Sequence, residues 1–173
     1  STTQKYTLGH DATLALRLKD PSFKMMPLDR FSAGSLRVFK GKADQLPMLI
    51  VGDFNGDGVK NDAAVFGTRI NAKGETKLVG YMLVAEKVGH TLRYKVLDLP
   101  NSPFGDADYD EDRDVTMYLS LMDSSRKDSL QIKKDVIQKE VFGSPNTQFF
   151  YYDGGQVKEL SSDSTSAATS IVE

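Results

Sequence analysis

Short apolar runs, separated by closely spaced turn residues, constrain the fold of this chain more than any other feature. Between residues 91 and 97, apolar and polar side chains alternate strictly, as in a half-buried strand. Gly89-His90 and Asp153-Gly154-Gly155 are tight turns, the second of which favours a hairpin because glycine adopts positive φ at little cost. Parallel strands need a crossover of about a dozen residues or more, so these short turns predict antiparallel pairing. Seven or so short strands are expected, from eight candidate runs: 48–51, 63–70, 77–86, 91–97, 115–122, 135–142, 148–152 and 157–160.

Two segments before these strands have helical features. His10–Lys19 is ambiguous, because its leucines alternate as in a strand while its alanines and lack of β-branched residues suit a helix. Residues 29–39 have apolar side chains near helical spacing, with Asp29 or Ser32 as the N-cap and Gly41 as the end. The sequence therefore predicts an α+β domain: a single curved, mainly antiparallel sheet with one or two N-terminal helices. We expect one globular domain over residues 1–160 and a flexible tail over residues 161–173, which is rich in Ser and Thr.

The loop between the first two of these strands has the oxygen spacing of a calcium site. In GDFNGDGVKND, residues 52–62, oxygen side chains occupy alternate positions and a glycine follows the third. Calcium takes six to eight oxygen ligands at about 2.3–2.6 Å, and a tightly curled backbone can aim every second side chain inward. The glycine allows a sharp turn that brings the next carbonyl into the shell, and a further ligand is due at the ninth loop position. The expected ligands are Asp53, Asn55, Asp57, the Val59 carbonyl and Asn61, or Asp62 one residue later. A metal-free Asx-Gly turn is the alternative reading of the same residues.

An EF-hand does not fit, because its twelfth position is Ala64 here instead of glutamate and its flanks read as strands instead of helices. VGDFNGDGVKNDAAVFG, residues 51–67, resembles the FG-GAP or VCBS-type calcium-loop repeat. The resemblance implies that the residues named above hold Ca²⁺. The family usually has aspartate at the ninth position followed directly by apolar residues, whereas this chain has Asn61 and then Asp62. The propellers built from this repeat carry several such loops, and this chain has a single one without blade periodicity, so a propeller is excluded.

The closing strands carry a second resemblance. KKDVIQKEVFG and QFFYYDGGQVKEL, within residues 133–160, are similar to the last strands of small bacterial envelope proteins or lipoproteins with a single GDFNGDG loop. Together with residues 27–39, the resemblance covers about two-thirds of the chain. It implies a periplasmic, extracellular or lipid-anchored location, with the signal segment not in the chain. That group has no assigned activity.

A second acidic stretch alternates strictly along residues 106–114. Like charges at this density repel one another unless a cation neutralises them. The sixth position is Glu111 instead of glycine, which leaves the tight curl without support. The candidates for a second cation site are Asp106, Asp108, Asp110, Asp112 and Asp114; a solvated acidic loop is the simpler reading.

Composition and missing motifs exclude several functions. A formal net charge of -2 argues against nucleic-acid binding, and the absence of cysteine excludes disulfides and thiolate metal sites. No apolar run is long enough to cross a membrane, for which about 20 residues are needed. His10 and His90 have no partner nearby in sequence, and the signatures of common hydrolases, NTPases and dehydrogenases are missing. One pair of the aromatic residues 149–152 is expected in the core, and the other could form an exposed platform.

We therefore expect a calcium-binding, non-enzymatic structural or binding domain of the bacterial envelope, with a cell-envelope protein or a glycan as its partner. The alternative is a calcium-dependent hydrolase acting on glycan or peptide, with carboxylates of residues 106–114 as acid and base.

Overall fold

Two antiparallel sheets form the centre of the molecule. The structure, a computed structural model, describes residues 8–42, 45–100, 109–145 and 147–160. The first sheet has the strand order β2-β3-β4-β5-β6, with β1 also paired to β4, and the second has the order β10-β9-β8-β7. The bounds are β1 Lys24–Met25, β2 Gln45–Leu46, β3 Leu49–Gly52, β4 Asp62–Ile70, β5 Thr76–Val88, β6 Thr91–Asp98, β7 Met117–Leu121, β8 Ile137–Val141, β9 Thr147–Asp153 and β10 Gln156–Leu160. The α+β class and the exclusion of a propeller are confirmed, because both sheets are open.

The expectation of one curved sheet is wrong. The strands up to β6 pair in the first sheet, and β7 pairs with β8 to begin the second. Alternation predicts that a segment is a strand and which residues share a face, but not which edge it joins. A backbone hydrogen bond from Leu119 N–H on β7 to the Pro47 carbonyl (3.0 Å) ties the second sheet to the first beside β2 and β3.

The N-terminal ambiguity is resolved as α1, His10–Lys19. Ala12 and Leu16 are buried, whereas Leu14 and Leu18 are 45% and 86% exposed, so a narrow stripe of the helix contacts β6. No helix in the described part of the chain is long and apolar enough to span a membrane.

The helix expected over residues 29–39 is divided into a 3-10 turn, Leu28–Arg30, and α2, Ala33–Val38. Ser32 caps α2 by accepting a hydrogen bond from the Ser35 N–H at 3.1 Å, as predicted. The break occurs at Phe31, which is buried and forms a β-bridge with Val115. A further helix, α4, Ser124–Ser129, was not expected because it is short and has no apolar periodicity.

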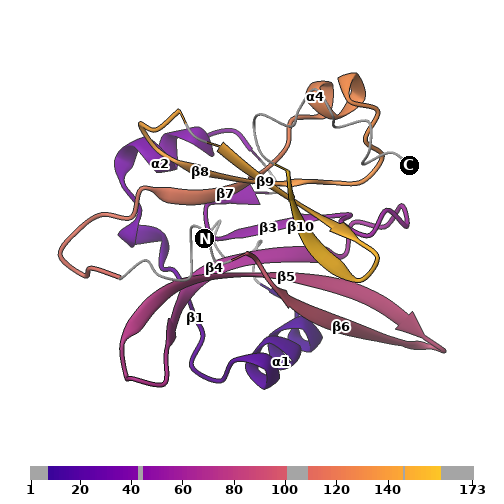
Figure 1. Ribbon diagram of the computed structural model, residues 1–173, viewed down its shortest axis with the longest axis horizontal. Helices are drawn as coiled ribbons and strands as arrows, with labels where there is room; N and C mark the ends of the chain where they lie inside the picture. Colours follow the sequence, from indigo (N-terminus) through magenta and orange to yellow (C-terminus); the bar gives the residue numbers. More distant parts are fainter. Residues whose placement is uncertain (1–7, 43–44, 101–108, 146, 161–173) are drawn as a thin grey trace.

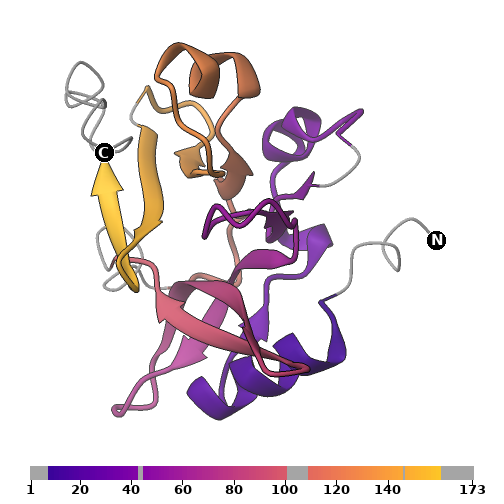
Figure 2. The ribbon, with the colours of Figure 1, turned by 90° about the vertical axis from the view of Figure 1, so that its right-hand side faces the viewer.

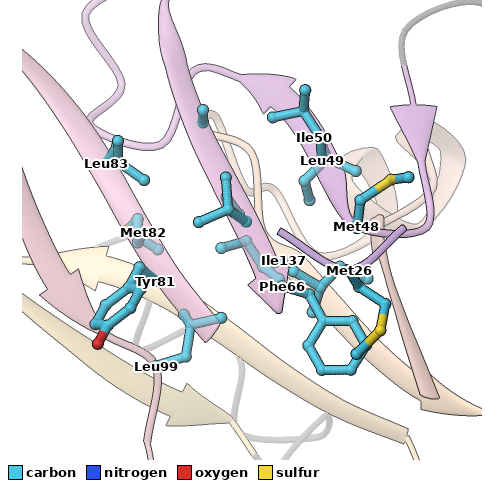
Figure 3. Close-up of a cluster of buried hydrophobic side chains, with 14 of the residues drawn as sticks. Met26, Met48, Leu49, Ile50, Phe66, Tyr81, Met82, Leu83, Leu99 and Ile137 are labelled. Atoms are coloured by element: carbon cyan, nitrogen blue, oxygen red, sulfur yellow. The ribbon is translucent and has the colours of Figure 1, made fainter. Parts of the chain in front are cut away.

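The first sheet is covered on both faces, by α1 on one and by the second sheet on the other (Figures 1 and 2). Figure 3 shows side chains of β3, β4 and β5 packed together, with Ile137 of β8 beside Phe66 of β4. On the other face, Tyr81 Oη donates a hydrogen bond to the Asp20 carboxylate just after α1, at 2.7 Å. The main core therefore spans three layers.

The second sheet is also covered on both faces. Phe150 packs into the main core, whereas Phe149 packs into a smaller cluster with Met122, Ile132, Val136 and Leu160. Both phenylalanines are buried, and Tyr151 and Tyr152 are half-buried beside them. The buried pair is therefore two consecutive residues on opposite faces, and not alternate residues on one face as the sequence suggested.

Candidate metal centre

The Asp/Gly loop (residues 53–62) connects β3 to β4 where the two sheets meet. In Figure 1 it is the purple coil at the right-hand end of β3. Gly52 and Asp62 are partners across the two strands, so the strand pairing brings the ends of the loop together. Ile50 on β3 and Ala64, Val65 and Phe66 on β4 are fully buried, which anchors both ends in the core.

Asp53 organises the first half of the loop. Its Oδ1 accepts hydrogen bonds from the N–H groups of Gly56 and Asp57 at 2.9 and 3.1 Å. Its Oδ2 accepts one from the N–H of Gly58 at 2.8 Å. Gly58 has φ +86°, which supplies the sharp turn that the spacing predicted. The backbone is therefore wrapped around the first expected ligand.

The next two oxygens follow the same curl. Asn55 Oδ1 accepts a hydrogen bond from the Asp57 N–H at 3.2 Å, and Asp57 Oδ1 accepts one from the Val59 N–H at 2.9 Å. Asn55 Nδ2 donates to the Ala85 carbonyl on β5 at 3.2 Å, which fixes the direction of its amide. Each of these oxygens has further lone-pair capacity, so the hydrogen bonds hold the shape of the loop without excluding a cation.

Asn61 provides the most informative atom of the loop. Its Oδ1 is buried and has no hydrogen-bond partner among the residues that the structure describes. Its backbone N–H donates to the Val59 carbonyl at 3.0 Å, which brings the seventh and ninth loop positions together. A buried amide oxygen without a partner costs free energy unless a donor or a cation meets it. An unpartnered oxygen at the ninth loop position agrees with the expected calcium shell, in which Asn61 would be a ligand; calcium binding itself stays a prediction.

Asp62 has a different environment from the other candidates. It is fully buried, and its Oδ2 accepts hydrogen bonds from the N–H groups of Phe54 and Asn55 at 2.7 and 3.1 Å. Its Oδ1 accepts one from the Ala85 N–H at 2.8 Å. Burial raises the pKa of Asp62, and the three backbone donors oppose that rise by favouring the carboxylate. Asp62 is thus a structural anchor that ties the start of the loop to β5.

A residue far away in sequence completes the support. The Asp53 N–H donates to Asp135 Oδ2 at 2.8 Å, and the Asp135 N–H donates to the Asp53 carbonyl at 2.8 Å. Lys127 Nζ lies 2.6 Å from Asp135 Oδ1. Sequence reasoning missed both residues, because they precede β8 and carry no spacing signal linked to the loop.

The described part of the second acidic stretch is held by an arginine. Arg30 Nη2 donates to the carbonyls of Glu111 and Arg113 at 2.6 and 3.0 Å. Arg30 Nε also donates to Tyr109 Oη at 2.7 Å, and this hydrogen bond is the main reason that the pKa of Arg30 is raised. Asp112 and Asp114 are exposed, and Asp110 forms an exposed ion pair with Arg113 at 3.5 Å. Of the candidates for a second cation site, Asp106 and Asp108 lie outside the described residues.

Across the residues that the structure describes, no three His, Cys, Asp or Glu side chains are placed to hold a metal ion together. The Asp/Gly loop contains three such side chains, of which Asp62 is buried beneath backbone donors, while Asp53 and Asp57 lie among amide and carbonyl oxygens. His90 lies in the turn between β5 and β6 and is exposed. His10 is exposed at the start of α1.

A scan against protein-family models, a search of curated proteins and a search of solved structures found no match to this chain. What the protein does therefore has to follow from the chemistry of its own residues.

Proposed function

We propose that this protein is a calcium-binding, non-enzymatic domain in which one Ca²⁺ fixes the connection between β3 and β4. The observation that carries the proposal is the buried Oδ1 of Asn61, which has no hydrogen-bond partner in the described part of the chain and stands at the ninth position of a loop with calcium-ligand spacing. A metal-free turn gives no reason to bury this oxygen without a donor, whereas a cation does.

The donor set suits a hard divalent cation. Asp53 and Asp57 would contribute two negative charges, and Asn55, Asn61 and the Val59 carbonyl would contribute neutral oxygens. Two carboxylates offset the charge of one Ca²⁺. Because the remaining ligands are neutral, we expect affinity in the range of extracellular calcium modules, with a Kd of about 10⁻⁴–10⁻³ M. Asp62 is left out of the ligand set because it is fully buried and one of its donors is Ala85 on β5, whereas Asp53, which also accepts three N–H groups, is only half-buried.

The cellular role is proposed from the resemblance of the loop and the closing strands to FG-GAP/VCBS-type and bacterial envelope proteins. We propose a periplasmic, secreted or lipid-anchored structural or binding module whose partner is a cell-envelope protein or a glycan. Calcium at about 1 mM outside the cell would fill about half to nine-tenths of the sites over this Kd range.

A calcium titration tests the proposal. An ion that binds only the folded state stabilises it by RT ln(1 + [Ca²⁺]/Kd), which is about 2.7 kcal/mol at 100 times the Kd. We expect calcium to raise the Tm of the wild-type protein, and chelation by EDTA to lower it again. Asp57→Ala and Asn61→Ala should remove most of this rise.

Asp128→Ala is the matched control, because Asp128 is an exposed carboxylate on α4 and its loss should leave the calcium response unchanged. An equal Tm in calcium and in EDTA for the wild-type protein, with no binding heat in calorimetry, would refute the proposal. A response that persists in Asn61→Ala but disappears in Asp57→Ala would instead remove Asn61 from the ligand set.

A further inference from the structure

We infer that Asp135 is the positioning residue of the calcium loop, so that calcium binding is linked to the docking of residues 127–136 against it. This inference rests on the proposed calcium site. It concerns how the second sheet prepares the first ligand, and it assigns Asp135 no contact with the ion.

The contact between the two segments is reciprocal. Asp53 donates its N–H to the Asp135 carboxylate and accepts the Asp135 N–H at its own carbonyl, both at 2.8 Å. Two hydrogen bonds on either side of one residue fix both peptide units of Asp53, which sets the direction of the first ligand. Asp53 in turn accepts three N–H groups of the loop, so an error in its placement would spread through residues 56–58.

The close approach depends on Gly52. A Cβ at this position would lie 2.8 Å from Asp135 Oδ2 and 3.3 Å from Asp135 Cβ. Cβ atoms essentially never lie within 3.0 Å of another heavy atom, so any larger residue would force either Asp135 or the backbone of residue 52 to shift. The first glycine of the GDFNGDG motif therefore makes room for a residue 83 positions later in the sequence, from 52 to 135.

The charge of Asp135 is accounted for without the metal. Its side chain is 10% exposed and pairs with Lys127, which is 16% exposed. One carboxylate oxygen faces Lys127 and the other faces the Asp53 N–H, so both are engaged. This arrangement suits a residue that orients a ligand and has no need of the cation itself.

Residue 134 strengthens the same contact. Its Cβ lies 3.5 Å from where a Cβ on Gly56 would be, so this segment runs along the loop. Lys134 Nζ donates to the Tyr152 carbonyl on β9, which ties the segment to the second sheet. The segment before β8 therefore contacts both the Asp/Gly loop and the second sheet.

Thermodynamic linkage connects calcium affinity to the docking of residues 127–136. If the ion binds well only when Asp53 is held by Asp135, the undocked fraction of molecules reduces the apparent affinity. By reciprocity, bound calcium must favour the docked state of residues 127–136 by the same factor.

Calcium affinity and backbone hydrogen exchange of the full chain test the inference. We expect Asp135→Ala to raise the calcium Kd about tenfold, the change expected when a charge-assisted hydrogen bond is lost. Asp135→Asn keeps an oxygen that can accept the Asp53 N–H, so it should recover most of the affinity. The matched control is Asp128→Ala, which removes an exposed carboxylate from the same segment and should change Kd less than about twofold.

Hydrogen exchange supplies the second readout. In the wild-type protein, calcium should slow exchange both in the loop and in residues 127–136. In Asp135→Ala, protection of the loop should persist at saturating calcium while protection of residues 127–136 is lost.

The outcomes separate this inference from the proposed function. A wild-type protein that binds no calcium refutes the site and the linkage together. A wild-type protein that binds calcium without added protection over residues 127–136 overturns the linkage alone, whether or not the variants fold. Equal affinity in wild type and a folded Asp135→Ala overturns the positioning role and leaves the calcium site standing.

Discussion

The carboxylate of Asp62 accepts the backbone N–H of Ala85 on β5 at 2.8 Å, and this contact ties the end of the Asp/Gly loop to the centre of the first sheet. Asp62 and Asn61 are adjacent in sequence, yet Asp62 accepts three backbone N–H groups, whereas Asn61 has a buried oxygen with no hydrogen-bond partner among the described residues. The two positions that sequence reasoning could not distinguish therefore have different physical tasks.

The anchoring role predicts a stability loss that does not depend on calcium. Asp62→Asn replaces an acceptor of three hydrogen bonds by an amide that cannot accept all of them, and a buried donor left unsatisfied costs about 1–3 kcal/mol. We expect the free energy of unfolding in EDTA to fall by about 2 kcal/mol, measured by urea denaturation. Asn61→Ala serves as the contrast, because in EDTA it should be no less stable than wild type. Equal stability losses for the two variants would show that the assignment is wrong.

The burial of Lys139 leads us to expect that the free energy of unfolding depends on pH. It lies on β8 with only 4% of its surface exposed, and burial lowers its pKa to about 8 from an ordinary value of 10.5. Between these pH values the unfolded chain binds more protons than the folded one, so the stability contributed by this group rises with pH from about 8 to about 10.5. Below pH 8 the buried, charged side chain lowers the free energy of unfolding by an amount that no longer changes with pH. Its hydrogen bond to Gln148 Oε1 at 3.0 Å offsets part of this cost.

Lys139→Met removes that buried charge. We expect the variant to be more stable than wild type by about 2 kcal/mol at pH 7, with the difference shrinking as the pH approaches 10. Urea denaturation of both proteins from pH 6 to pH 10 measures it. Because the difference is taken at each pH, titration of other residues cancels. A constant difference across this range would mean that Lys139 keeps its proton in the folded protein.

The hydrogen bonds of Arg30 lead us to expect that substituting it loosens residues 109–114 and leaves the rest of the fold unchanged. Its guanidinium donates to Tyr109 and to the carbonyls of residues 110, 111 and 113. A lysine ammonium is compact and lacks the planar, spread-out donors needed to reach all four acceptors. We expect Arg30→Lys to speed backbone hydrogen exchange over residues 109–114 while exchange in β4 and β5 stays as in wild type. Arg126→Lys, on α4, is a control of the same chemistry. Unchanged exchange over residues 109–114 would show that other contacts order this loop.

Most of the strands could be predicted because each carries its own local signal. The runs 63–70 and 91–97 match β4 and β6 within one residue at each end, and Ser32 caps α2 as its sequence position indicates. Errors arose where a tertiary contact decided the local structure. Phe31 breaks a helical pattern because its bridge to Val115 pairs backbone groups that a helix would have used internally. Local periodicity contains no information about that partner.

The sequence by itself determined which loop carries the spacing of a cation site, because the oxygen side chains and the glycine that turns the backbone are both local properties of residues 53–62. Only the tertiary structure decided which residues of that loop are free to bind. The distinction between Asn61 and Asp62 depends on Ala85 of β5, and the placement of Asp53 depends on Asp135 before β8. Hydrogen bonds act over about 3 Å in space whatever the separation along the chain. The different environments of the loop residues therefore arise only once the two sheets have packed around the loop.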